Sequence, residues 1–140
     1  MSDPYLALQV LMMPKDANGS VLHGNARDAY YLTIFGGVIL SYIDQAGAIG
    51  ARREVVRAGG PPPTLVTVAM NRVEFKRPVL VGDVVRFWTR RVRIGRTSIA
   101  VQVSVEAERG PEVLPVTEAE VVYVGVDPDG PERKPRPLLG

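Results

Sequence analysis

The sequence predicts an α+β protein in which an antiparallel sheet of about five strands wraps around one long buried helix. From Val38 to Ala51 apolar residues occupy every face, which is typical of a helix surrounded by other elements. Beyond Gly59 to Pro63 the chain consists of strand-like segments joined by short turns, and such connections favour antiparallel pairing. Because one sheet covers only one side of such a helix, we expect a second copy of the chain to cover the other side.

Length and composition restrict the class of protein. The 140 residues are sufficient for a single domain, with its core in residues 5–126. No apolar run reaches the roughly 18 residues of a membrane span, and the first residues lack the pattern of a secretory signal, so we expect a cytoplasmic protein that does not bind membranes. The absence of cysteine excludes a thiolate nucleophile and a zinc–thiolate site.

The amino-terminal part begins with an apolar segment from Tyr5 to Met13, which predicts a first strand closed by Pro14. From Lys15 to Thr33 the chain is polar and rich in turn-forming residues, so residues 15–33 are predicted to form a loop. A connection of about 19 residues is longer than most. This length favours a functional loop, a lid or an inserted short helix.

The remaining elements follow from periodicity and from turn-forming residues. The helix is predicted to run to about Ala58, where glycines and prolines end it. The tail, residues 127–140, is basic and rich in proline, and we expect it to be mobile. Four strands are predicted between the helix and the tail: Leu65 to Phe75 with a bulge near Asn71–Arg72, Val84 to Ile94, Ile99 to Glu108, and Val116 to Val126.

A single carboxylate, Asp44, interrupts the apolar helix. Burying a charge is costly unless the charge is paired or hydrogen-bonded. Asp44 is therefore either a structural acid satisfied by its neighbours or the reactive group of a pocket. Ahead of it, Gly36 and Gly37 leave backbone amides uncovered at the positive end of the helix, where they can hold a carbonyl oxygen or an anion. Amide donors and a carboxylate two turns apart suggest a reaction centre.

Several segments, through their order and spacing, resemble the hotdog-fold acyl-coenzyme A thioesterases of the acyl-CoA hydrolase subgroup. The resemblance covers about residues 5–130. It implies the hotdog fold, hydrolysis of acyl-CoA thioesters without a cofactor, and self-association as a dimer and as a hexamer of three dimers. The segments are Met13 to Asn18, Ile34 to Gly37 with Asp44 seven positions later, Val73 to Asp83, Gly95 to Ser98, and Val126 to Gly130.

The resemblance also implies roles for individual residues. Asp44 corresponds to the catalytic acid, which acts as base or nucleophile, and amides near Gly36 and Gly37 would polarise the thioester carbonyl. Asn18 matches an active-site asparagine that the partner subunit contributes. The eighteen positions from Asn18 to Gly36 exceed the family's spacing by about eleven residues. Either Asn18 still reaches the site or Asn25, in the inserted loop, has taken its place.

Arginines gather in the strand from Val84 and in the turn that follows it. Between Asp83 and Glu106 there are five arginines and no acid. Arginine binds phosphate in a bidentate fashion, and coenzyme A carries a 3′-phosphate and a pyrophosphate. The alternative is a solvated strand face. Nucleic acid is not expected, because the cluster lacks interleaved aromatic residues and a DNA-reading motif. The candidate substrate-binding residues here are Arg93, Arg96, Thr97 and Ser98.

Two other functions are compatible with the same fold. A non-catalytic acyl-CoA-binding or scaffold module is one, because a fold hosts many functions. A hotdog hydratase is the other, but it needs a histidine together with an acid. The only histidine, His23, lies in the predicted loop without a paired aspartate at that spacing, so a surface position is expected. We therefore predict an enzyme, an acyl-CoA thioesterase, and no metal site, since the sequence contains no cluster of metal ligands.

Overall fold

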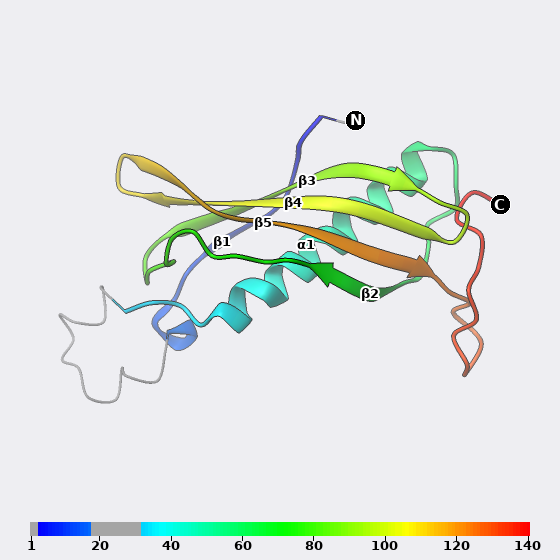
Figure 1. Cartoon of the computed structure of the whole chain (residues 1–140), viewed down its shortest axis with the longest axis horizontal. Coiled ribbons are helices and arrows are strands. Elements are labelled where there is room, and N and C mark those ends of the chain that lie inside the picture. Colours follow the sequence, from blue (N-terminus) through cyan, green and yellow to red (C-terminus); the bar gives the residue numbers. More distant parts are fainter. Residues whose placement is uncertain (1–2, 18–31) are drawn as a thin grey trace.

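The fold consists of one long helix lying along one face of a five-stranded antiparallel sheet (Figure 1). The structure is a computed structural model that describes residues 3–17 and 32–140. It confirms the α+β architecture and the hotdog arrangement predicted from the sequence. The elements in chain order are β1 (Tyr5–Leu11), the short 3-10 helix η1 (Pro14–Asp16), α1 (Gly36–Arg57), β2 (Leu65–Asn71), β3 (Val84–Ile94), β4 (Ser98–Arg109) and β5 (Glu112–Gly125).

The order of strands across the sheet is β1-β3-β4-β5-β2, and every neighbouring pair is antiparallel. The last three strands of the chain lie together in the middle, because short turns connect them. β1 and β2, which precede and follow α1, form the two edges. This order places β2 directly beside β5, where Thr67 pairs with Tyr123.

The core lies between the sheet and one face of α1. On β4, the alternate residues predicted to face inward are all buried, with at most 3% of each exposed. The helix is not buried on every side within one chain. Its far face leaves 40% of Ile49 and 46% of Val56 exposed, so the expected second copy would have apolar surface to cover. The inward-facing residues of β4 are Ile99, Val101, Val103, Val105 and Ala107.

The bounds of β2 and β5 differ most from the prediction. β2 ends at Asn71 rather than at Phe75, because Arg72 has a φ of +37°, which lies in the left-handed region and ends the extended conformation. The bulge lies between Thr67 and Ala69 rather than near residue 71. β5 begins earlier than predicted, immediately after the tight turn that follows β4.

The ends of the predicted long loop lie side by side. Ala17 forms an antiparallel bridge with Ile34, and the amide of Phe35 donates to the carbonyl of Asp16 at 3.2 Å. η1 occupies the first residues of the predicted loop. Whatever path the chain takes between these anchors, it leaves and returns beside the start of α1.

The carboxy-terminal segment, residues 127–140, contacts the rest of the chain at several points. The amide of Arg136 donates to the carbonyl of Gly125 at 2.8 Å, and the amide of Leu138 donates to the carbonyl of Arg96 at 3.0 Å. Leu138 is buried, and its carbonyl lies against Gly60 with no room for a side chain there. The tail therefore contacts both the β3–β4 turn and the end of α1 (Figure 1).

Candidate functional site

The carboxylate of Asp44 is held by two hydroxyl groups from neighbouring strands. Thr67 of β2 donates to Oδ1 of Asp44 at 2.7 Å. Tyr123 of β5 donates to the backbone carbonyl of Asp44 at 2.6 Å and approaches Oδ1 at 3.2 Å. Thr67 and Tyr123 are cross-strand partners, so a single register places both hydroxyls against one turn of the helix.

The two donors divide the carboxylate into a bound oxygen and an open one. Both hydroxyls converge on Oδ1, whereas no donor among residues 3–17 and 32–140 reaches Oδ2. Burial in the first place, and then the negative charge of Asp44, raise the pKa of Tyr123 well above its ordinary value. The phenol therefore stays protonated and remains a donor. Asp44 is satisfied by its neighbours, as a structural acid would be, yet retains one oxygen for chemistry.

Two glycines allow the sheet to approach α1 this closely. A Cβ atom on Gly47 would collide with the hydroxyl of Tyr123, and one on Gly50 would collide with the side chain of Thr89. The small residues in the second half of the helix thus permit close packing, as the sequence predicted. At Gly47 this packing lets a tyrosine hydroxyl reach the backbone of the helix.

Gly36 and Gly37 form the exposed first turn of α1. Neither amide donates a hydrogen bond to any other described residue, and the Phe75 ring lies 3.6 Å from the point where a Cβ of Gly36 would be. Seven residues separate Gly37 from Asp44, which corresponds to about 10 Å along a helix. The two groups that the sequence suggested as one centre are thus about two turns apart within one chain.

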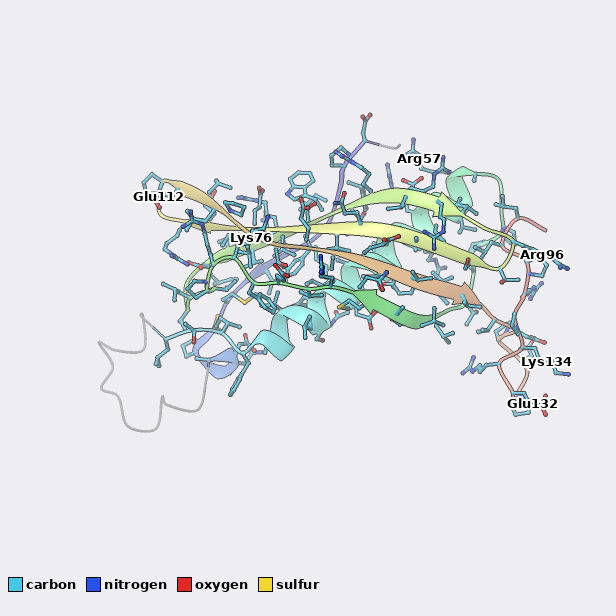
Figure 2. The ribbon with its side chains drawn as sticks, in the orientation of Figure 1. Arg57, Lys76, Arg96, Glu112, Glu132 and Lys134 are labelled. Carbon is cyan, nitrogen blue, oxygen red and sulfur yellow. The ribbon has the colours of Figure 1, made fainter. Side chains whose placement is uncertain are left out.

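The structure separates the candidate phosphate-binding residues. Arg93 on β3 forms an exposed ion pair with Glu120 of β5 at 3.2 Å. Arg96 lies in the β3–β4 turn, at the opposite end of the sheet from Glu112 (Figure 2). It lines an open hollow with residues of the tail. The carbonyls of Thr97 and Ser98 accept backbone hydrogen bonds at 2.8 Å and 2.7 Å, which holds the turn in place.

Some sequence predictions concern residues outside the described part of the chain. Asn18, Asn25 and His23 all lie there, so their positions relative to Asp44 stay predictions. Within the described ranges, no cluster of histidine, aspartate or glutamate is suited to bind a metal ion. No helix in those ranges is long and apolar enough to cross a membrane.

Sequence reasoning missed Thr67 and Tyr123 as site residues. For Tyr123 a signal was present: it occupies an inward-facing position on a strand, and a buried tyrosine hydroxyl needs a hydrogen-bond partner. For Thr67 there was none, because threonine is common in strands for other reasons. Both assignments depend on the pairing of β2 with β5, which the order of segments in the chain does not reveal.

Comparison with known proteins identifies the family. Residues 31–114 match the family model of the Thioesterase superfamily. The acyl-CoA thioester hydrolase YciA of Salmonella typhimurium is 39% identical over 138 residues, spanning 95% of this chain and 89% of the relative. Cj0915, a hexameric hotdog fold thioesterase of Campylobacter jejuni, is 38% identical with a TM-score of 0.75, covering 94% of this chain and 88% of that one.

A third similar protein is HI0827, a hexameric broad specificity acyl-coenzyme A thioesterase whose structure is known for its Asp44Ala mutant enzyme. It is 32% identical with a TM-score of 0.72, covering 96% of this chain and 86% of that one. The family match covers more than half of the sequence, and the YciA relative extends it over nearly the whole length. The chain belongs to the Thioesterase superfamily.

Proposed function

We propose that this protein hydrolyses acyl-coenzyme A thioesters to a free acid and coenzyme A, and that Asp44 is its catalytic acid–base or nucleophile. The observation that carries the proposal is the half-buried carboxylate of Asp44. The Thr67 hydroxyl donates to one of its oxygens and the Tyr123 hydroxyl approaches the same oxygen, whereas the other oxygen has no donor among the described residues. The names of the similar proteins support the reaction. The study of HI0827 as its Asp44Ala mutant enzyme shows that an aspartate has been a target of substitution in a similar thioesterase.

The chemistry needs a proton acceptor and donors for the developing oxyanion. In the general-base route, the open oxygen of Asp44 takes a proton from water while the water oxygen attacks the thioester carbon. The C–S bond then breaks, and the proton returns to the departing sulfur of coenzyme A. In the nucleophilic route, the Asp44 carboxylate attacks and displaces the thiolate of coenzyme A. Water then hydrolyses the resulting anhydride, which releases the free acid, restores the carboxylate and supplies the proton that the thiolate takes up. Neither route requires a cofactor, because coenzyme A is part of the substrate.

The oxyanion donors are proposed to come from a second chain. The amides of Gly36 and Gly37 stand about 10 Å along the helix from Asp44 of their own chain. The exposed apolar face of α1 offers a surface on which two copies can associate. If two antiparallel helices overlap through their first halves, the start of one helix lies beside Asp44 of the other. We therefore propose a dimer as the smallest active unit, with three dimers forming a hexamer, as the hexameric relatives suggest.

The same arrangement gives Asn18 a role. Asn18 directly follows Ala17, which is paired with Ile34 near the start of α1. We propose that Asn18 acts with the glycine amides on the thioester, opposite Asp44 of the partner chain. Asn25 is the alternative candidate for this role. Comparing Asn18→Ala with Asn25→Ala in one assay distinguishes them, because loss of turnover is expected only for the residue at the site.

Arg96 is proposed as the main contact for the phosphates of coenzyme A, aided by Thr97 and Ser98. Its turn is fixed by backbone hydrogen bonds, whereas Arg93 already has Glu120 as a partner. For such an enzyme we propose a cytoplasmic location, in keeping with a chain that contains no cysteine.

The test is a thiol-release assay with acyl-CoA substrates of several chain lengths. Asp44→Ala is expected to lower kcat by about 10²–10⁴-fold, the contribution of a general base. Circular dichroism and sedimentation of this variant should match the wild-type protein. Most of the activity surviving in Asp44→Ala would overturn the assignment of the site. Wild-type protein that binds acyl-CoA without releasing thiol would instead favour the non-catalytic module.

A further inference from the structure

We propose that Tyr123 is a positioning residue for this reaction, whose hydroxyl orients Asp44 so that one fixed carboxylate oxygen faces the substrate. The inference rests on the proposed role of Asp44. It goes beyond that role because it assigns the orientation of Asp44 to a residue on β5. It also gives a reason for the glycine at position 47 of the helix.

Tyr123 reaches both the backbone and the side chain of the residue that it is proposed to position. Its side chain is 1% exposed, and its hydroxyl lies 2.6 Å from the carbonyl oxygen and 3.2 Å from Oδ1 of Asp44. The hydroxyl has one proton, which it donates mainly to the nearer carbonyl oxygen and shares with Oδ1, so the contact links the side chain of Asp44 to the backbone of the helix. Free rotation of Asp44 about its first side-chain bond would break the second contact.

The Thr67 hydroxyl, as a second donor, further restricts the orientation of the Asp44 carboxylate. Thr67 also donates to Oδ1, so both hydroxyls select the same oxygen. The two oxygens of a carboxylate are equivalent, so contacts on one of them matter because they fix the plane of the group and thereby the direction of the other oxygen. Thr67 lies on an edge strand and is exposed in the single chain, whereas Tyr123 is buried in a central part of the sheet. The rigid part of the arrangement is therefore the tyrosine.

The helix is shaped to receive this hydroxyl. Gly47 lies one turn beyond Asp44, and any side chain there would occupy the position of the Tyr123 hydroxyl. A glycine inside a helix is unfavourable relative to alanine. Gly47 therefore makes the helix less stable at the position that the Tyr123 hydroxyl contacts. The contact between that hydroxyl and Asp44 offers a reason for keeping a glycine there.

Tyr123→Phe tests the inference because it keeps the ring and removes only the hydroxyl. We expect kcat to fall about tenfold, the effect of losing one hydrogen bond to the reacting group, with KM nearly unchanged. A residue with a purely structural role would lower the melting temperature without this selective loss of kcat.

Tyr42→Phe is the matched control. Tyr42 also lies between the helix and the sheet, with its ring 5.8 Å from that of Phe87, and it makes no described contact with Asp44. Its kcat and KM are expected to equal those of the wild-type protein. A lower melting temperature in Tyr123→Phe with unchanged kcat would make Tyr123 structural and overturn the inference.

Asp44→Ala, measured in parallel, separates this inference from the function on which it rests. If Asp44→Ala loses turnover while Tyr123→Phe behaves like Tyr42→Phe, the inference fails and the proposed function stands. If Asp44→Ala retains turnover, the proposed site fails and the inference falls with it. Loss of turnover in Asp44→Ala, together with a tenfold decrease in kcat at nearly unchanged KM in Tyr123→Phe, supports both.

Discussion

The two halves of the proposed reaction centre are built in opposite ways. Asp44 lies against the sheet, where hydroxyls of Thr67 and Tyr123 hold it from two paired strands. Gly36 and Gly37 stand at the exposed start of the same helix, and a side chain placed on Gly37 would meet nothing within 4 Å. One chain thus completes the acidic half by itself and leaves the donor half open.

This difference shows which part of the site fixes the direction of the reactive oxygen and which part gives the substrate room to enter. The acidic half must present one oxygen in a defined direction, and packing within one folded chain provides that direction. The donor half must admit a large substrate, and an exposed helix start provides room. We expect a second chain to bring the two halves together, so catalysis should depend on assembly.

Removing an amide donor should impair the donor half of the site without affecting the acidic half. Gly37→Pro deletes the N–H at position 37, and proline is tolerated in the first turn of a helix. Loss of one oxyanion donor is expected to lower kcat by about 10²–10³-fold. Gly37→Ala, which keeps the amide and meets no neighbour, should retain most of the activity. Steady-state thiol release measures both variants.

Mixed oligomers then show whether the halves come from different chains. Co-expressed Gly37→Pro and Asp44→Ala chains, each with its own tag, can be purified as mixed assemblies. If the site is shared between chains, part of the activity returns, since some sites receive both intact halves. Mixed assemblies that remain as inactive as either variant would show that one chain supplies both halves.

Removing the Thr67 hydroxyl from the acidic half should lower kcat less than the loss of an amide donor. Thr67→Val keeps the shape of the side chain and deletes the hydroxyl on Oδ1 of Asp44. Because Tyr123 still approaches the same oxygen, we expect a decrease in kcat of about tenfold, the lower end for a hydrogen bond to a charged group. Thr117→Val is the control, since that hydroxyl donates to the carbonyl of Glu74 instead. Equal effects of both variants on kcat would contradict a role for Thr67.

The smallest effect is expected far from both halves, at the phosphate contacts. Arg96→Gln should raise KM by up to about fivefold with little change in kcat, because an exposed charge contact contributes about 0.2–1 kcal/mol. Arg93→Gln should raise it less, since Arg93 is paired with Glu120. Higher salt should reduce the difference between wild type and Arg96→Gln. A larger KM change in Arg93→Gln would move the phosphate site to the face of the sheet.

Sequence patterns predicted the elements whose periodicity is strong. β3 has the predicted bounds, and the buried alternation of β4 was legible because valine and isoleucine recur at every second position. The end of β2 was wrong because the left-handed conformation of Arg72 leaves no mark in a run of strand-forming residues. The tail was expected to be mobile because prolines and charges dominate it, yet one leucine, Leu138, anchors it.

The candidate site was predictable to the extent that residue type alone marks it. Asp44 stood out as the only acid in an apolar run, and the glycine pair stood out by its place at a helix start. Thr67 and Tyr123 did not stand out, since 56 positions separate them in the sequence and only the pairing of β2 with β5 brings them together. Partners of a reactive group are harder to predict than the group itself when distant strands supply them.

The fit between Gly47 and Tyr123 constrains the order in which these two positions can change during evolution. Alanine at position 47 would place a methyl group against the phenol hydroxyl. After Tyr123→Phe the nearest ring atom would be 3.1 Å away, and a small shift would accommodate that methyl. Alanine would then favour the helix by about 1 kcal/mol. A lineage that loses the hydroxyl first can gain a more stable helix, whereas one that loses the glycine first meets a clash.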